Sequence, residues 1–167
     1  RQLNLDAKLI FQSPKSRGDT ADNNVISSLS ELKEKNVIIL NLSDKLGNIQ
    51  ELGKSFRRWI KKKNHRFVSA MSLGDLATDK ISLITDAMDV NYRPFQANHE
   101  KLRKMFDEAE EIHITTDAGT DLYYNIKGIN GISADGDYTK PGTGGNLPAG
   151  EVYAPPNGKR VEGTVVI

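Results

Sequence analysis

The hydrophobic pattern of this chain changes its period near residue 110. Before that point, short continuous apolar runs, such as residues 37–40, alternate with segments whose apolar residues recur at helical spacing. After it, apolar and polar residues alternate one by one at 111–116 and again at 121–127. The first pattern is typical of parallel α/β layers and the second of antiparallel hairpins. We therefore predict the α/β fold class, with an α/β N-terminal domain at 1–110 followed by a β-rich segment at 111–167.

The first part repeats a strand–loop–helix unit three times. We expect strands at 8–12, 37–40 and 66–71. We expect helices over 25–32 and 49–60, a helix within 72–87 that begins near Asp75, and a helix over 96–110. Asp44 is a candidate cap for the second helix, and four residues should face inward from the last one: Leu102, Met105, Phe106 and Ala109. The strand at 37–40 should be covered on both faces. No glycine-rich loop separates a strand from its helix, so a phosphate-binding signature is absent and this part is predicted to be scaffold.

Composition excludes several kinds of partner and site. The formal net charge is +1, which creates no global field for nucleic acid or an acidic membrane surface. The chain has no cysteine, so disulfides, thiolate metal sites and cysteine nucleophiles are excluded. No apolar run approaches the roughly 18 residues of a membrane span. We expect a cytoplasmic protein that binds neither nucleic acid nor membrane, and we assign the basic cluster at 57–63 to the favourable C-terminus of a helix.

A glycine- and proline-rich stretch at 142–156 contains a single acid, Glu151, where the loop becomes a predicted strand. A carboxylate at the end of a stiffened loop is a candidate metal or substrate ligand, and the alternative is an exposed glutamate on a structural loop. The three histidines, His65, His99 and His113, are scattered and show no metal-ligand spacing. Glu151 is therefore the one candidate metal ligand that the pattern offers.

Two motifs give this stretch a family context. Residues 146–153 read Asn-Leu-Pro-Ala-Gly-Glu-Val-Tyr, followed by Pro155 and the strand-like run 161–166, and residues 115–122 read Thr-Thr-Asp-Ala-Gly-Thr-Asp-Leu. Together they resemble the aminopeptidase T-like family of leucyl metallo-aminopeptidases, over roughly 98–167. The resemblance implies a homodimeric hydrolase that removes N-terminal residues from a peptide substrate. It also implies two divalent metal ions (zinc, cobalt, manganese or magnesium) in each complete active site, with Glu151 as one ligand.

The same resemblance implies that 111–167 is the start of a metal-binding catalytic domain, since the family's other ligands come later in its chain. The chain starts at Arg1 and stops within a β-branched run, so we interpret it as a fragment. We expect this fragment to be inactive alone, because a catalytic zinc takes three protein ligands. Two alternatives stay open. Ring-cleaving 2,5-dihydroxypyridine dioxygenases share a similar Leu-Pro-x-Gly-Glu-Val-Tyr segment and use one iron(II). A non-catalytic interaction module would use the basic helix around Trp59 instead.

Overall fold

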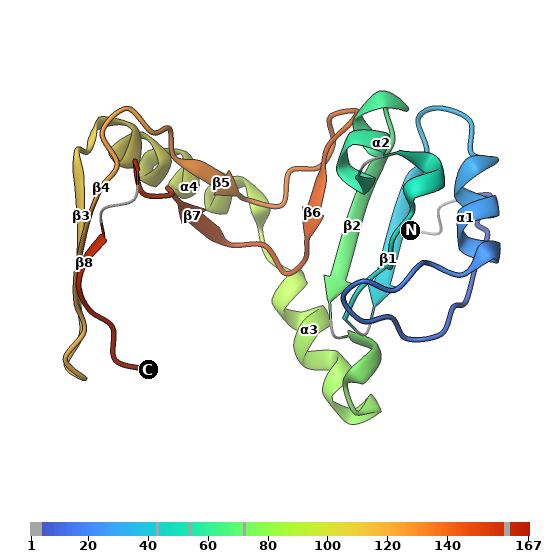
Figure 1. Cartoon of the computed structure of the whole chain (residues 1–167), viewed down its shortest axis with the longest axis horizontal. Coiled ribbons are helices and arrows are strands. Elements are labelled where there is room, and N and C mark those ends of the chain that lie inside the picture. Colours follow the sequence, from blue (N-terminus) through green and yellow to red (C-terminus); the bar gives the residue numbers. More distant parts are fainter. Residues whose placement is uncertain (1–4, 43, 54, 72, 159–160) are drawn as a thin grey trace. The chain divides into compact units, whose positions relative to one another are not determined.

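The computed structural model describes residues 5–42, 44–53, 55–71, 73–158 and 161–167, and these form two compact units (Figure 1). Unit 1 comprises Arg1–Met88 and Tyr138–Pro148, and unit 2 comprises Asp89–Asp137 and Ala149–Ile167. The predicted α/β class is confirmed, since a parallel sheet is followed along the chain by antiparallel strands. The predicted domains, 1–110 and 111–167, stay a prediction. None of the helices in the described ranges has the length and apolar character needed to cross a membrane.

Unit 1 is built on a three-stranded parallel sheet with strand order β1-β2-β6. Its strands are β1 (Val37–Leu42), β2 (Arg66–Met71) and β6 (Gly144–Asn146), and its helices are α1 (Asn23–Ser30), α2 (Phe56–Lys62) and α3 (Ile81–Met88), with short 3-10 turns η1 (Gln50–Leu52), η2 (Leu73–Asp75) and η3 (Thr78–Lys80). Parallel β1 and β2 need a crossover between them, and α2 provides it. The predicted strands at 37–40 and 66–71 are therefore confirmed.

The core of unit 1 lies on one face of this sheet. Side chains from α1 and α2, including Ile26, Leu29 and Ile60, pack with Phe67 of β2 and with partly buried residues of β1. The opposite face of β1 is open, since Val37 is 57% exposed and Ile39 is 69% exposed. The prediction that this strand is covered on both faces is therefore wrong, because both flanking helices pack on the same side.

Three local expectations in unit 1 are also wrong. Residues 8–12 form no strand, because an apolar run becomes a strand only where a neighbour completes its ladder. Asp44 caps no helix. The cap of α2 is Ser55, whose side chain accepts a hydrogen bond from the backbone N–H of Arg58. The helix within 72–87 starts at Ile81, after two 3-10 turns.

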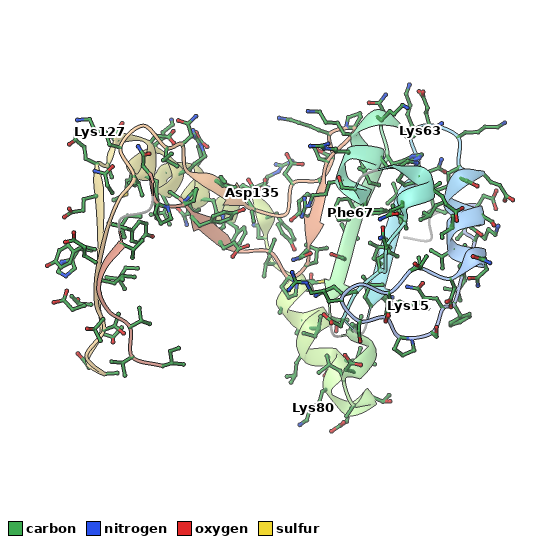
Figure 2. All side chains as sticks on the ribbon, in the orientation of Figure 1. Lys15, Lys63, Phe67, Lys80, Lys127 and Asp135 are labelled. Carbon is green, nitrogen blue, oxygen red and sulfur yellow. The ribbon has the colours of Figure 1, made fainter. Side chains whose placement is uncertain are left out.

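β6 is a strand that hydrophobic patterning misses, because it consists of Gly144, Gly145 and Asn146. A Cβ on Gly144 would overlap the ring and carbonyl oxygen of Phe67, and a Cβ on Gly145 would overlap the ring of Tyr138. Figure 2 labels Phe67 on β2. Only glycine therefore lets this segment return to unit 1 and complete the sheet.

The described residues of unit 2 form one long helix and five strands in two small antiparallel sheets. The helix is α4 (Tyr92–Glu108), and the strands are β3 (Glu111–Thr115), β4 (Asp121–Asn125), β5 (Ile132–Ala134), β7 (Glu151–Tyr153) and β8 (Val161–Thr164). β3-β4-β8 form one sheet and β5-β7 the other. The predicted hairpin is confirmed, and its turn uses Gly119 at φ 101°.

The orientation of α4 agrees with the prediction for Phe106 and differs from it for Leu102 and Met105. Leu102 is 41% exposed and Met105 is 65% exposed, so neither faces inward. The packed face carries Phe106, as predicted, together with Phe95, and both lie against glycine backbone: a Cβ on Gly131 would lie 3.0 Å from Phe106 Cβ. Helical spacing alone could not distinguish these faces, because apolar residues occur on both.

Candidate functional site

Glu151 is the first residue of β7 and lies opposite Ala134 of β5. Its side chain is exposed. The chain passes from unit 1 to unit 2 just before it, after a cis peptide bond between Leu147 and Pro148. Glu151 is therefore presented at a strand start immediately after the crossing, as the glycine–proline stretch predicts.

One face of the β5–β7 pair packs on α4. Ser133 points to this side, since its Oγ lies 3.3 Å from Nδ1 of His99. The ring of His99 lies 4.2 Å from the ring of Phe95, and Phe95 Cζ would lie 3.2 Å from a Cβ on Gly150. Because strand side chains alternate, Glu151 points to the other face, away from α4.

The face that carries Glu151 is open and partly apolar. Tyr153 follows two residues later and pairs with Ile132 across the ladder, and they are 46% and 44% exposed. Glu151 therefore stands at one end of a strip that also presents an aromatic ring and an aliphatic side chain.

The histidines occupy three separate settings. His65 is fully buried in unit 1, and His99 packs on α4 beside Ser133. His113 is exposed on the hairpin, where its Nε2 lies 2.8 Å from a carboxylate oxygen of Asp121 and its ring stacks on Tyr123 at 3.8 Å. Periodicity places His113 and Asp121 on the same strand face, so their pairing could have been found from the hairpin register.

No group of three or more histidine, aspartate or glutamate side chains capable of holding a metal ion occurs among the described residues. A non-haem iron(II) site needs two histidines and one carboxylate, and a catalytic zinc needs three protein ligands. The described residues thus do not form a complete metal centre, and the role of Glu151 as a metal ligand stays a prediction.

The hairpin residues of the second motif have structural roles. Thr120 is 8% exposed, and its Oγ1 accepts a hydrogen bond from the backbone N–H of Val166 at 3.1 Å. The backbone N–H of Thr116 donates to the carbonyl of Thr120 at 3.1 Å. The second bond closes the turn and the first ties it to the chain after β8, so Thr120 stabilises the hairpin.

The net charge of +1 conceals a separation between the units. Unit 1 contains 16 Lys and Arg residues against 10 Asp and Glu, whereas unit 2 contains 7 against 12. The basic residues of α2 belong to the positive unit, and one of them, the exposed Arg57, donates to the carbonyl of Gly144 at 3.1 Å. The prediction that the chain binds no nucleic acid stays a prediction.

Comparison with known protein families finds a match for residues 81–167, more than half of the 167-residue chain. The matching family is described as NicX, 2,5-dihydroxypyridine 5,6-dioxygenase. The matched range includes α3 and all of unit 2, with Glu151 and the hairpin motif. No curated protein and no solved structure matches the chain significantly.

This match overturns the main interpretation from the sequence. The resemblance to aminopeptidase T-like enzymes, and with it the hydrolase and protease activity on peptides, is wrong, because the matched family is one of dioxygenases, which are oxidoreductases. The alternative reading as a ring-cleaving dioxygenase is the one that the match supports. The chain belongs to the 2,5-dihydroxypyridine 5,6-dioxygenase (NicX) family.

Proposed function

We propose that the protein to which this chain belongs is a ring-cleaving dioxygenase acting on a dihydroxylated pyridine. The observation that carries the proposal is the family match over 81–167, which spans the segment presenting Glu151. The reaction expected from the family's description adds both atoms of O2 to the substrate and opens the ring between C5 and C6. A metal cofactor is compatible with this chemistry, and we propose a single iron(II) ion.

Glu151 is the proposed carboxylate ligand of that iron. Its position supports the role, since β7 pairs with β5 and the opposite face of the pair packs on α4, which fixes the strand that carries it. The described residues do not complete an iron site, so two further ligands, histidines in the usual arrangement, have to come from elsewhere in the active protein.

The surroundings of Glu151 suit a planar aromatic substrate. Tyr153 lies on the same strand face, and the exposed side chain of Ile132 lies beside it. A pyridine ring can stack on an aromatic side chain, while its hydroxyl groups remain free to reach a metal held at Glu151. We propose that this strip forms part of the substrate-binding wall.

Oxygen consumption tests the proposed reaction. The purified protein is loaded with iron(II) without air, mixed with 2,5-dihydroxypyridine and exposed to oxygen. We expect loss of the pyridine absorbance with one O2 consumed per ring, and both atoms of ¹⁸O2 in the product. Iron-loaded protein that consumes no oxygen with this substrate, or that incorporates oxygen from water alone, would refute the proposal.

The role of Glu151 needs a readout that does not depend on activity. Iron retained after desalting should fall strongly in the variant Glu151→Gln. The matched control is Glu111→Gln, because Glu111 is also an exposed acid at the first residue of a strand in unit 2. Equal iron retention in both variants would show that Glu151 is not a ligand.

A further inference from the structure

The parallel sheet of unit 1 has one open face. Val37 and Ile39 of β1 are 57% and 69% exposed on this face, and Val68 of β2 lies beside Ile39 in the register. Parallel sheets are normally covered by helices on both sides. An exposed aliphatic sheet face of this kind marks a surface that another element covers.

α3 is a largely apolar helix that is not buried in unit 1. Five of its eight residues are apolar (Ile81, Leu83, Ile84, Ala87 and Met88), yet none of its residues is buried, and Leu83 is 62% exposed. A helix shorter than about 12 residues is marginal in water without tertiary packing. α3 therefore also needs a surface, and an apolar one.

The charges of the two elements are opposite. Lys35 precedes β1, and Arg66 lies on the open face because it is two residues before Val68 in β2; its Nη1 donates to the carbonyl of Thr139 at 3.4 Å. Asp79 lies in η3 just before α3 and forms an ion pair with Lys80 at 3.9 Å, so Asp86, within the helix, supplies the acidic charge of α3. In the described ranges, neither Lys35 nor Asp86 takes part in an ion pair. An acidic, apolar helix and an apolar face with a basic rim are suited to each other.

Within one chain α3 leaves the open face of the sheet exposed. α3 lies beyond the carboxyl ends of β1 and β2 (Figure 1), whereas the basic rim is at their amino ends, where the backbone N–H of Lys35 donates to the carbonyl of Lys63 at 3.2 Å. Figure 2 shows Lys63 and Lys80 at opposite ends of unit 1. The acidic residues around α3 are thus remote from the basic rim of their own sheet.

We propose that α3 of one copy packs on the open face of the β1–β2–β6 sheet of a second copy, and that the second copy returns the same contact. This arrangement is a two-fold symmetric dimer with two identical helix-on-sheet contacts. Leu83 covers Ile39 across each contact, and Asp86 lies toward Arg66. The sheet then becomes covered on both faces, as parallel sheets require. The proposal concerns unit 1 and does not depend on the dioxygenase reaction.

The oligomeric state tests this directly. Sedimentation velocity on the full chain should show a dimer for the wild-type protein. Ile39→Lys and Leu83→Asp should each raise the dimer dissociation constant at least about tenfold. Met105→Lys is the matched control, because Met105 is 65% exposed, as the two test residues are, but lies on α4. Far-ultraviolet circular dichroism checks that each variant is folded.

Mixing the two variants separates a broken contact from a damaged fold. In a mixed dimer, one contact joins a native helix to a native sheet. The other sets the lysine introduced at position 39 against the aspartate introduced at position 83, which is an attractive pair. We expect the equimolar mixture to dimerise more tightly than either variant alone. A monomeric wild-type protein, a dimer unaffected by both substitutions, or a mixture no tighter than its components would each overturn the proposal.

Discussion

His65 should make the stability of unit 1 fall as the pH drops below its ordinary pKa of 6.5. Its side chain is fully buried, and its ring centroid lies 4.7 Å from that of Trp59. The backbone N–H of Asn36 donates to Nδ1 at 3.0 Å, so Nδ1 is the unprotonated nitrogen of a neutral ring. Burial lowers the pKa of His65, Lys63 lowers this pKa further, and Glu34 opposes the shift.

The sign follows from proton binding. Because the pKa of His65 is lower in the folded state than in the unfolded chain, the unfolded chain binds more protons in the interval between the two values. The stability that neutral His65 contributes is therefore fully present above pH 6.5 and is lost as the pH falls toward the folded-state pKa. The steepest loss that one group can cause is about 1.4 kcal/mol per pH unit. Protonation of Nδ1 would also place its N–H against the backbone N–H of Asn36, so the hydrogen bond between them would be lost.

The fluorescence of Trp59 provides the assay, since it is the chain's single tryptophan, is 6% exposed and lies in unit 1. Urea unfolding between pH 8 and about pH 5 should show the loss in the wild-type protein. In His65→Asn, the amide oxygen can still accept from Asn36, but the side chain does not titrate. We expect a less stable protein with a flat pH profile in this range. His99→Asn, in unit 2, is the control and should retain the wild-type slope. A slope that persists in His65→Asn would refute the argument.

Three other substitutions test the packing of the two units. Gly144→Ala should destabilise unit 1 by about 1–3 kcal/mol in the same unfolding assay, because the new Cβ overlaps Phe67 in both backbone and ring. Thr120→Val should cost about 1–3 kcal/mol in thermal unfolding of unit 2, since it leaves the backbone N–H of Val166 without its 3.1 Å acceptor; Thr115→Val, on the exposed strand surface, should cost far less. Gly163→Ala should detach β8 from β4, because its Cβ would collide with the carbonyl of Asp121, and amide hydrogen exchange in β4 should speed up accordingly.

Much of the fold could be predicted because its signals are local. The run at 37–40 and the alternation in the hairpin identify strands that the structure contains. β6 could not be predicted, because two of its three residues are glycines, and its place is fixed by the distant rings of Phe67 and Tyr138. The run at 8–12 carries a strand signal without a strand partner, so its backbone pairs elsewhere: the side chain of Asn24 donates to the carbonyl of Phe11 at 2.8 Å. Non-local contacts decided both cases.

For the candidate site, the sequence predicts the backbone geometry but not the reaction. The segment at 146–153 correctly predicts that Glu151 begins a strand, because glycine and proline determine backbone geometry directly. That geometry presents a carboxylate in the same way whether the metal beside it activates water or oxygen. The choice between these reactions depends on the identity of the metal and on its other ligands, since a zinc hydrolase and an iron(II) oxygenase can both use one glutamate. A motif built around a single ligand therefore predicts where a metal is bound and leaves the reaction open. For that reason, iron retention in Glu151→Gln and oxygen consumption in the wild-type protein answer two independent questions. If the variant keeps its iron and the wild-type protein consumes oxygen with the substrate, the proposed reaction stands and Glu151 is not a ligand of the metal.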